Sequence, residues 1–352
     1  MSFVKEAYIA QLAVKRASLL TKRIADEHLQ RGIEKKDKSP VTIGDFAAQA
    51  VIIHSILKNF PEDLIVGEEN SSLIKSQHLE PKILKEIDWV QKSDSVSNDK
   101  LGVITNAEEL CSAVDKGNSK GGHKGRIWAL DPIDGTSGFL RGAQYAVCLA
   151  LIVNGVVQVG VVGCPHLPHS LYEKDSKIGG IYTAVKGQGA YFQDLAAAVT
   201  SPYDSSHPIH LHNDYDFSKA RVVEGVEKGH SSHELQSLIE SKLKIAQPPV
   251  RLDSQVKYCA VANGDAEIYL RLPTSLSYRE KIWDHASGWL LVHESGGIVT
   301  DIFGNKLDFG SGRTLNSQGV IAATATLHPE IIKTVKDLVG EHGQMLYRFC
   351  SA

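Results

Sequence analysis

Four carboxylates in this sequence lie where an expected strand ends or an expected helix begins. They are Glu68, Asp131, Asp134 and Asp284. Clusters that offer only oxygen ligands select hard cations such as Mg²⁺, which keeps several water molecules and takes further ligands from a substrate phosphate. The four residues therefore predict a magnesium site that acts on a phosphorylated small molecule.

Two of these carboxylates belong to the turn Asp131-Pro-Ile-Asp-Gly-Thr136. Proline has a fixed φ angle and no N–H group that needs a partner, so the turn can direct both carboxylates and the Ile133 carbonyl toward one point. Gly135 then permits a backbone turn into Thr136, whose hydroxyl and neighbouring amides would open a helix N-terminus suited to an anionic phosphate. The turn has the groups that a metal-dependent phosphate site needs.

Each acidic residue also has a purely structural explanation. Thr42 and Asp45 have the spacing of a capping box, Asp284 could cap a helix, and the six-residue turn could be an ordinary one. Considered singly, Asp45 and Asp284 fit the capping explanation better, because such signals occur at most helix starts. The six-residue turn fits the metal-binding explanation better.

The first half of the chain is expected to hold most of the elements that position these groups. Apolar residues at helical spacing and short apolar runs predict helices at residues 9–24 and 44–59 and strands at residues 64–66 and 126–130. Residues 70–124 are polar, and they predict a surface insertion that is mostly irregular, with one helix near residues 82–90.

The second half begins with a predicted hairpin. Asn154-Gly155 supplies the positive φ angles of a tight turn between apolar runs at residues 145–153 and 156–162. From about residue 201, strands predicted at residues 220–224, 250–252, 266–270 and 298–300 alternate with helices predicted at residues 232–243 and 284–294. We therefore expect an α+β lobe at residues 1–199 and an α/β lobe at residues 200–352.

Composition limits the class of protein. The 352 residues include 38 Lys and Arg and 41 Asp and Glu, and the formal net charge of −3 excludes a general polyanion binder, which needs a basic surface. With 42% apolar and 22% charged residues, the chain is typical of globular proteins. Its length predicts two lobes with a cleft between them.

The cysteines and the apolar runs favour a cytoplasmic protein over a secreted or membrane protein. The five cysteines form no C-x-x-C pair and are expected to be reduced thiols. Lys5, Lys15 and Arg16 interrupt any run of signal-peptide type, and the apolar stretch at residues 145–153 is shorter than the roughly 20 residues of a spanning helix. We expect a monomer in the cytoplasm or nucleus, with no duplex nucleic acid and no membrane as partner.

Several separate stretches together resemble one known superfamily. Gly67-Glu68-Glu69, Asp131-Pro-Ile-Asp-Gly-Thr136 and Trp283-Asp284-His285-Ala286, in this order, resemble the signature of the lithium-sensitive, magnesium-dependent phosphatases that include inositol monophosphatase. Within it, the chain is most similar to the fungal 3′(2′),5′-bisphosphate nucleotidases, through stretches that include Ser39-Pro-Val-Thr42, Gly138-Phe-Leu-Arg-Gly142, Leu252-Asp-Ser-Gln255 and Tyr269-Leu-Arg-Leu-Pro273. The resemblance covers nearly the whole chain and is weakest in the insertion and the C-terminal tail.

The resemblance implies an αβαβα layered fold and removal of the 3′-phosphate from 3′-phosphoadenosine 5′-phosphate, which leaves AMP, together with activity on the sulfated relative of this nucleotide. It implies Mg²⁺ ions, two or three per site, held by Glu68, Asp131, the Ile133 carbonyl, Asp134 and Asp284. Asp45 and Thr136 would take the proton from the attacking water. The implied nucleotide contacts are Thr136, His230, Ser254, Lys257 and Arg271. Sensitivity to Li⁺ and Na⁺ and a role in sulfate assimilation and salt tolerance are implied as well.

One residue departs from the family pattern. Bisphosphate nucleotidases commonly carry lysine directly after the Asp-Gly-Thr turn, whereas this chain has Ser137. We expect weaker substrate binding with the chemistry intact.

Two other motifs resemble known sites less well. The segment Gly117 to Lys124 approaches a phosphate-binding P-loop, but His123 stands where lysine must follow glycine, so a flexible loop is the better interpretation. Cys164, His166 and His169, together with His207, His210 and His212, invite a zinc interpretation, but their spacing is irregular and prolines indicate loops.

Two other functions compete with a nucleotidase. An inositol-phosphate phosphatase would use the same metal turn, although the segments around His230 and Arg271 resemble the nucleotidases. A non-catalytic nucleotide sensor on this fold would be expected to lack Asp45, Glu68 or Asp134, and all three are present.

Overall fold

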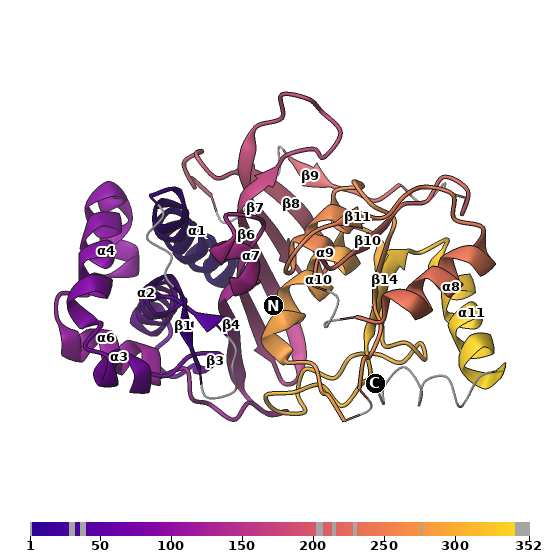
Figure 1. Ribbon diagram of the computed structural model, residues 1–352. Coiled ribbons are helices and arrows are strands. Elements are labelled where there is room, and N and C mark those ends of the chain that lie inside the picture. The colour runs from indigo at the N-terminus through magenta and orange to yellow at the C-terminus, as the bar shows by residue number, and fades with distance from the viewer. Residues whose placement is uncertain are drawn as a thin grey trace.

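The computed structural model describes residues 2–27, 32–35, 40–201, 207–212, 216–227, 231–275 and 277–341. Within these ranges, a seven-stranded sheet and a five-stranded sheet alternate with layers of helices (Figure 1). Helices cover the outer face of each sheet, and α9 and α10 lie between the two sheets. This is the αβαβα order that the resemblance implied.

The first helical layer contains α1 (Val4–Asp26), α2 (Ile43–Asn59), α3 (Ser72–Ser76), α4 (Glu80–Ser93), α5 (Asn98–Leu101) and α6 (Ala107–Asp115). α1 packs along α2 and contacts the seven-stranded sheet, and α2 contacts α4, α5 and α6. α1 and α2 confirm the helices predicted at residues 9–24 and 44–59.

The helix predicted near residues 82–90 is confirmed as α4, but the expectation of an otherwise irregular surface insertion at residues 70–124 was wrong. The segment contains α3, α4, α5 and α6, together with a 3₁₀ turn at Ser95–Ser97, instead of one helix in an irregular surface insertion. Ile83 and Ile87 of α4 and Leu110 and Val114 of α6 are fully buried in the same core as α1 and α2. Each pair has the i, i+4 spacing of one helix face, so the segment is an integral part of the first layer.

The large sheet has the order β3-β4-β5-β6-β7-β8-β9. Its strands are β3 (Leu64–Gly67), β4 (Arg126–Asp134), β5 (Ala146–Val153), β6 (Val156–Pro168), β7 (Ile178–Val185), β8 (Gly189–Asp194) and β9 (Pro208–Ile209). β3 is parallel to β4, and the other neighbours are antiparallel. The predicted hairpin is confirmed as β5 and β6, with φ angles of 51° at Asn154 and 78° at Gly155.

β5 shows how this sheet is covered on both faces. Val147, Leu149 and Leu151 belong to the core under the first helical layer. Cys148 and Ala150, which alternate with them, belong to the core on the other face, against α9 and α10. Because successive side chains of a strand point to opposite faces, a strand buried on both sides has the continuous apolar sequence seen here.

The second sheet has the order β11-β10-β12-β14-β13. Its strands are β10 (Val222–Glu224), β11 (Val250–Arg251), β12 (Ile268–Arg271), β13 (Gly297–Thr300) and β14 (Val320–Thr324). Between the sheets lie α9 (Val256–Ala262) and α10 (Ala286–Glu294), and a third core joins the outer face to α8 (His233–Leu243) and α11 (His328–Glu341). The predicted strands at residues 220–224, 250–252, 266–270 and 298–300 are confirmed with small shifts.

Two boundaries differ from the expected ones. The helix predicted at residues 284–294 is divided into a 3₁₀ turn, η3 (Ile282–Asp284), and α10. β9 pairs with β8, so the large sheet continues beyond residue 199, and the lobe boundary at residues 199 and 200 stays a prediction. In the described ranges, no helix has both the length and the hydropathy needed to span a membrane.

Candidate functional site

A pocket of about 710 Å³ gathers most of the predicted site residues. Its lining includes nine of them, namely Glu68, Asp131, Ile133, Asp134, Thr136, Ser254, Lys257, Arg271 and Asp284. Asp45 does not line the pocket but contacts Thr136. His230 lies outside the described residues. The structure thus brings together residues from both sheets, at the ends of β3, β4 and β12, and from the segments that follow β11 and precede α10.

The six-residue acidic turn forms the end of β4. One extra residue is accommodated between Asp131, which pairs with Cys148, and Asp134, which pairs with Ala146. This bulge suits Pro132, which has no N–H to give to a strand ladder. Inside it, the Ile133 amide donates to Asp131 Oδ1 over 3.2 Å.

Gly135 ends this turn in a conformation that favours glycine. Its φ angle is 85°, and a Cβ atom there would lie 2.9 Å from the Ser254 side chain. Glycine therefore allows the turn before α7 (Thr136–Leu140) to approach Ser254 closely. Ser254 itself has a φ angle of 61°, a strained value for a residue with a side chain, of the kind that collects at functional sites.

Gln255 connects two of the predicted ligands. Its amide N–H donates to Asp134 Oδ2 over 2.6 Å, and its side-chain nitrogen donates to the Trp283 carbonyl over 2.7 Å. Trp283 directly precedes Asp284 in η3. The helix α10 begins after His285 without a side-chain cap, so the capping explanation for Asp284 is wrong.

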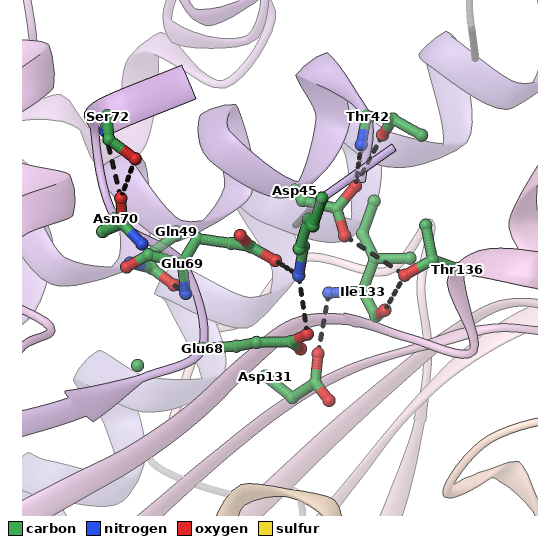
Figure 2. Close-up of polar contacts among 12 residues, drawn as sticks. Thr42, Asp45, Gln49, Glu68, Glu69, Asn70, Ser72, Asp131, Ile133 and Thr136 are labelled. Carbon is green, nitrogen blue, oxygen red and sulfur yellow. Dashed lines mark hydrogen bonds and ion pairs between the residues drawn. The ribbon is translucent and has the colours of Figure 1, made fainter. Parts of the chain in front are cut away.

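Asp45 uses its two carboxylate oxygens differently (Figure 2). Oδ2 accepts hydrogen bonds from the Thr42 amide at 2.8 Å and from the Thr42 hydroxyl at 2.7 Å, which completes the predicted capping box of α2. Oδ1 lies 3.4 Å from the Thr136 hydroxyl, and that hydroxyl also lies 3.2 Å from the Ile133 carbonyl. One hydroxyl proton serves only one acceptor at a time, so Thr136 can alternate between the two.

Glu68 and Glu69 share a lysine that the sequence analysis did not single out. Lys35 Nζ donates to Glu68 Oε1 at 2.9 Å and also to Glu69 Oε1. Burial by itself lowers the pKa of Lys35, but the two carboxylates raise the pKa above its ordinary value. The ammonium group thus offsets part of the negative charge at the end of β3.

Gln49 holds the same strand end from α2 (Figure 2). Its side-chain nitrogen donates to the Glu69 carbonyl at 2.7 Å, and its side-chain oxygen accepts from the Glu69 amide at 3.0 Å. Gln49 lies four residues after Asp45 and is fully buried. Its burial and its bonds to Glu69 follow from the fold, so no pattern in the sequence singles out Gln49.

The carboxyl groups on the acidic wall of the pocket disfavour one another's charged form. Burial raises the pKa of Asp131 well above its ordinary value, and the charges of Glu68, Asp134 and Asp284 raise it further. Burial also raises the pKa of Asp284 strongly, with Asp134 as the next cause. Carboxylate oxygens in such surroundings are a donor set that fits a hard divalent cation.

Three lysine and arginine residues line the same pocket, and two of them, Lys257 and Arg271, are predicted site residues. Burial lowers the pKa of Lys257 to about 8, and its Nζ donates to the Ser254 carbonyl over 2.6 Å. Arg271 Nε donates to Glu280 Oε1 over 2.8 Å. Glu280 also lies 3.2 Å from His285 Nε2, and Tyr258 bonds the other ring nitrogen of His285 over 2.7 Å. This buried network fixes the position of Arg271.

Among the described residues, one group of His, Cys, Asp and Glu has all its ligand atoms within 4.8 Å of one another, namely Glu280, Asp284 and His285. The six residues of the zinc interpretation form no such group within the same ranges. His166 Nδ1 and His169 Nε2 instead lie 3.1 Å and 2.9 Å from the backbone carbonyls of Ala143 and Gly179.

The chain belongs to the inositol monophosphatase family, whose family model matches residues 4–339. Solved structures show the same fold. An IMPase of Thermotoga maritima is 22% identical to this chain and superposes with a TM-score of 0.59. The match covers 94% of this chain and 96% of the Thermotoga chain. The inositol monophosphatase of Anabaena is 20% identical with a TM-score of 0.57, covering 95% of this chain and 96% of its own.

Several curated relatives are more similar in sequence to this chain than these solved structures are. 3′(2′),5′-bisphosphate nucleotidase 1 of Candida albicans is 51% identical over 349 residues, 96% of each chain. The 3′(2′),5′-bisphosphate nucleotidase of Emericella nidulans is 46% identical and covers 96% of this chain and 99% of its own. That of Schizosaccharomyces pombe is 44% identical over 95% of each chain. These matches identify the chain as an enzyme of the phosphatase class.

Proposed function

We propose that the protein is a Mg²⁺-dependent 3′(2′),5′-bisphosphate nucleotidase, which removes the 3′-phosphate of 3′-phosphoadenosine 5′-phosphate and leaves AMP. The observation that carries the proposal is a pocket whose lining includes the four predicted carboxylate ligands together with three basic residues, Lys257, Arg271 and Lys281. The carboxylates suit metal ions at the phosphate to be cleaved, and the basic residues suit a second phosphate on the same molecule. The names of the fungal relatives support this substrate.

The carboxylates of Glu68, Asp131, Asp134 and Asp284, with the carbonyl of Ile133, would hold the Mg²⁺ ions, two or three per site. Such ions lower the pKa of bound water and stabilise the entering and leaving oxygens of an in-line displacement. The protein's own part in phosphoryl transfer is then mainly to position the groups and to balance charge. The fixed turn Asp131 to Thr136 and the contact of Gln255 with Asp134 support this positioning.

Asp45 and Thr136 would transfer the proton of the attacking water. Burial raises the pKa of Asp45 to about 7, which is near the pH at which a general base works best. Thr136 would pass its hydroxyl proton to Asp45 Oδ1 while it accepts the proton of the water. Asp45 Oδ2 stays occupied by Thr42 in the capping box.

The nucleotide would contact Thr136, Ser254, Lys257 and Arg271, and also His230. With a pKa of about 8, Lys257 carries a positive charge at neutral pH and attracts an anionic substrate. The hydrogen bonds of Glu280 with Arg271 and His285 hold the Arg271 side chain in place before the substrate binds.

An inositol-phosphate phosphatase is the second candidate function, because Ser137 lines the pocket where nucleotidases commonly have a cation. The test is phosphate release with Mg²⁺ from 3′-phosphoadenosine 5′-phosphate and, side by side, from inositol 1-phosphate. A large preference for the nucleotide supports the proposal. A preference for inositol 1-phosphate would keep the metal site and overturn the substrate assignment.

The proposal extends to activity on 3′-phosphoadenylyl sulfate and to inhibition by Li⁺, which would replace one weakly held Mg²⁺ without activating water. Activity in excess Mg²⁺ that ignored millimolar Li⁺ would contradict this part, and inhibition by Na⁺ is testable in the same assay. If the protein has a role in sulfate assimilation and salt tolerance, cells that lack it should grow poorly on sulfate and at high Na⁺.

A further inference from the structure

Arg313 makes a set of contacts that connects two parts of the candidate metal site. Nη2 donates to the Gly67 carbonyl over 2.6 Å, and Nη1 donates to the Ser119 carbonyl over 3.0 Å. The guanidinium also lies over the Trp283 ring, 4.7 Å from its centroid. Gly67 directly precedes Glu68 and Trp283 directly precedes Asp284, so one side chain touches the neighbours of both carboxylates. Arg313 itself does not line the pocket.

The backbone around Arg313 is joined to the segment that presents Asp284. The Ile282 amide donates to the Arg313 carbonyl over 3.1 Å, and the Leu315 amide donates to the Glu280 carbonyl over 2.8 Å. Lys281 and Thr314 form an antiparallel bridge between these bonds. The contacts make a short ladder that leads directly into η3.

The glycine-rich segment that resembled a P-loop provides the other side of the connection. The Gly67 amide donates to the Gly117 carbonyl over 2.8 Å, and the Ser119 amide donates to the Ile65 carbonyl over 3.0 Å, so the segment is paired with the edge of β3. A Cβ atom at Gly121 would lie 2.8 Å from the Gly312 carbonyl oxygen. The segment therefore packs backbone against backbone on the residues beside Arg313.

We propose that Arg313 is a positioning residue for divalent-cation binding, because it joins the backbone that presents Glu68 to the backbone that presents Asp284. The inference rests on the proposed metal site. A guanidinium offers donors in a rigid planar fork and can stack on an aromatic ring at the same time, which a lysine or an uncharged side chain does not reproduce. Groups that orient metal ligands affect metal affinity by about 10- to 100-fold.

The direction of the change in Mg²⁺ affinity on replacing Arg313 distinguishes a positioning role from a purely electrostatic one. Arg313 is a cation close to a cation site, so its loss would by charge alone strengthen Mg²⁺ binding. If its main role is to hold Glu68 and Asp284 at a workable separation, its loss must weaken Mg²⁺ binding instead.

The test is calorimetric titration of Mg²⁺ into the full chain without substrate, for wild type, Arg313→Met and Arg313→Lys. Arg221→Met is a matched control. Arg221 also donates to a backbone carbonyl, that of Gly264, and to the carboxylate of Glu267, and its guanidinium lies 4.5 Å from the centroid of the Tyr172 ring. Arg221 does not line the pocket. We expect about 10- to 100-fold weaker Mg²⁺ binding in Arg313→Met, a smaller loss in Arg313→Lys, and no change in the control. The KM for the nucleotide at saturating Mg²⁺ should stay within about twofold.

Unchanged or tighter Mg²⁺ binding in Arg313→Met overturns the inference, as does an equal loss in Arg221→Met. If Arg313→Met does not fold, wild-type affinity in Arg313→Lys overturns it. No saturable Mg²⁺ binding by the wild type overturns both the metal site and the inference. Weaker binding in the Arg313 variants, with no nucleotide hydrolysis by the wild type, upholds the inference while the proposed function fails.

Discussion

Asp45 shows that a structural and a functional explanation can both apply to one residue. The capping box predicted from Thr42 and Asp45 is confirmed, and it engages only Oδ2. Oδ1 lies toward the Thr136 hydroxyl (Figure 2). The role of Asp45 in proton transfer stays a prediction, and the geometry leaves one oxygen atom for it.

Replacing Asp45 with Asn should therefore separate chemistry from binding. The amide keeps the size of the side chain but cannot accept a proton, so kcat should fall by at least about 100-fold, while calorimetric Mg²⁺ affinity changes little. The free energy of unfolding should fall by no more than about 1 kcal/mol through the weakened cap.

Asn106→Ala is the control, because Asn106 caps α6 through a bond from the Glu109 amide, away from the pocket. It should lose about 1 kcal/mol of stability and keep full activity. Retained turnover in Asp45→Asn would return Asp45 to a capping role alone.

Ser137 gives a second prediction at the scale of one residue. It lines the pocket, so Ser137→Lys would add a cation beside the bound phosphates. We expect the KM for 3′-phosphoadenosine 5′-phosphate to fall by about three- to tenfold with kcat unchanged, because one additional hydrogen bond contributes about 0.5 to 1.5 kcal/mol. Steady-state kinetics that show the same KM in both proteins would remove the idea that Ser137 weakens substrate binding.

At the scale of elements, the turn between β4 and α7 depends on a close approach at Gly135. In Gly135→Ala, the methyl group would meet Ser254 at 2.9 Å and the residue would have to hold a φ angle of 85°. We expect a loss of about 1 to 3 kcal/mol in the free energy of unfolding and at least a tenfold loss in kcat/KM, because the acidic turn must move.

Gly187→Ala is the control for the cost of the positive φ angle alone. Gly187 has a φ angle of 72° and nothing within 4 Å of an added Cβ. This variant should lose about 1 kcal/mol of stability and no activity. Equal activity in the two variants would show that the contact of Gly135 with Ser254 does not position the site.

Elements with long, unbroken periodicity were predictable from the sequence, and short ones were not. The helix predicted at residues 44–59 is α2, and the Asn154-Gly155 turn joins β5 to β6 as expected. Residues 70–124 were misjudged because helices as short as α3 and α5 offer only about one turn of pattern. After residue 300, β14 was not predicted, and neither was α11, although it is 14 residues long.

The residues of the site also divide into those that could be predicted from the sequence and those that could not. The turn Asp131 to Thr136 is continuous in sequence, so its groups were predictable from local chemistry. Lys35, Gln49 and Arg313 act through partners that only the fold brings near. Arg313 donates a hydrogen bond to Gly67, which lies 246 positions away, and no sequence pattern around either residue predicts that contact.

At the scale of the molecule, the pocket collects carboxylates from the ends of β3 and β4 in the large sheet and from η3, which precedes α10. Their mutual repulsion should make stability depend on Mg²⁺. Saturation at about 100 times the Kd adds about 2.7 kcal/mol, so a chelator should lower the melting temperature measurably by differential scanning calorimetry.

Asp284→Asn should abolish most of the Mg²⁺-dependent gain and should stabilise the metal-free protein, because it removes a carboxyl group whose charged form is disfavoured by burial and by the charges of Asp134 and Glu68. Asp88→Asn, at an exposed position that pairs with Lys92, should change neither quantity. The same Mg²⁺-dependent gain in Asp284→Asn as in wild type would exclude Asp284 from the metal site.

The most direct test of the proposed function is to identify the products formed from 3′-phosphoadenosine 5′-phosphate. Chromatography of a reaction started with Mg²⁺ should show AMP and inorganic phosphate in equal amounts, and none of either in excess chelator. Adenosine 3′-phosphate as the product, or no release of phosphate at all, would contradict the proposal.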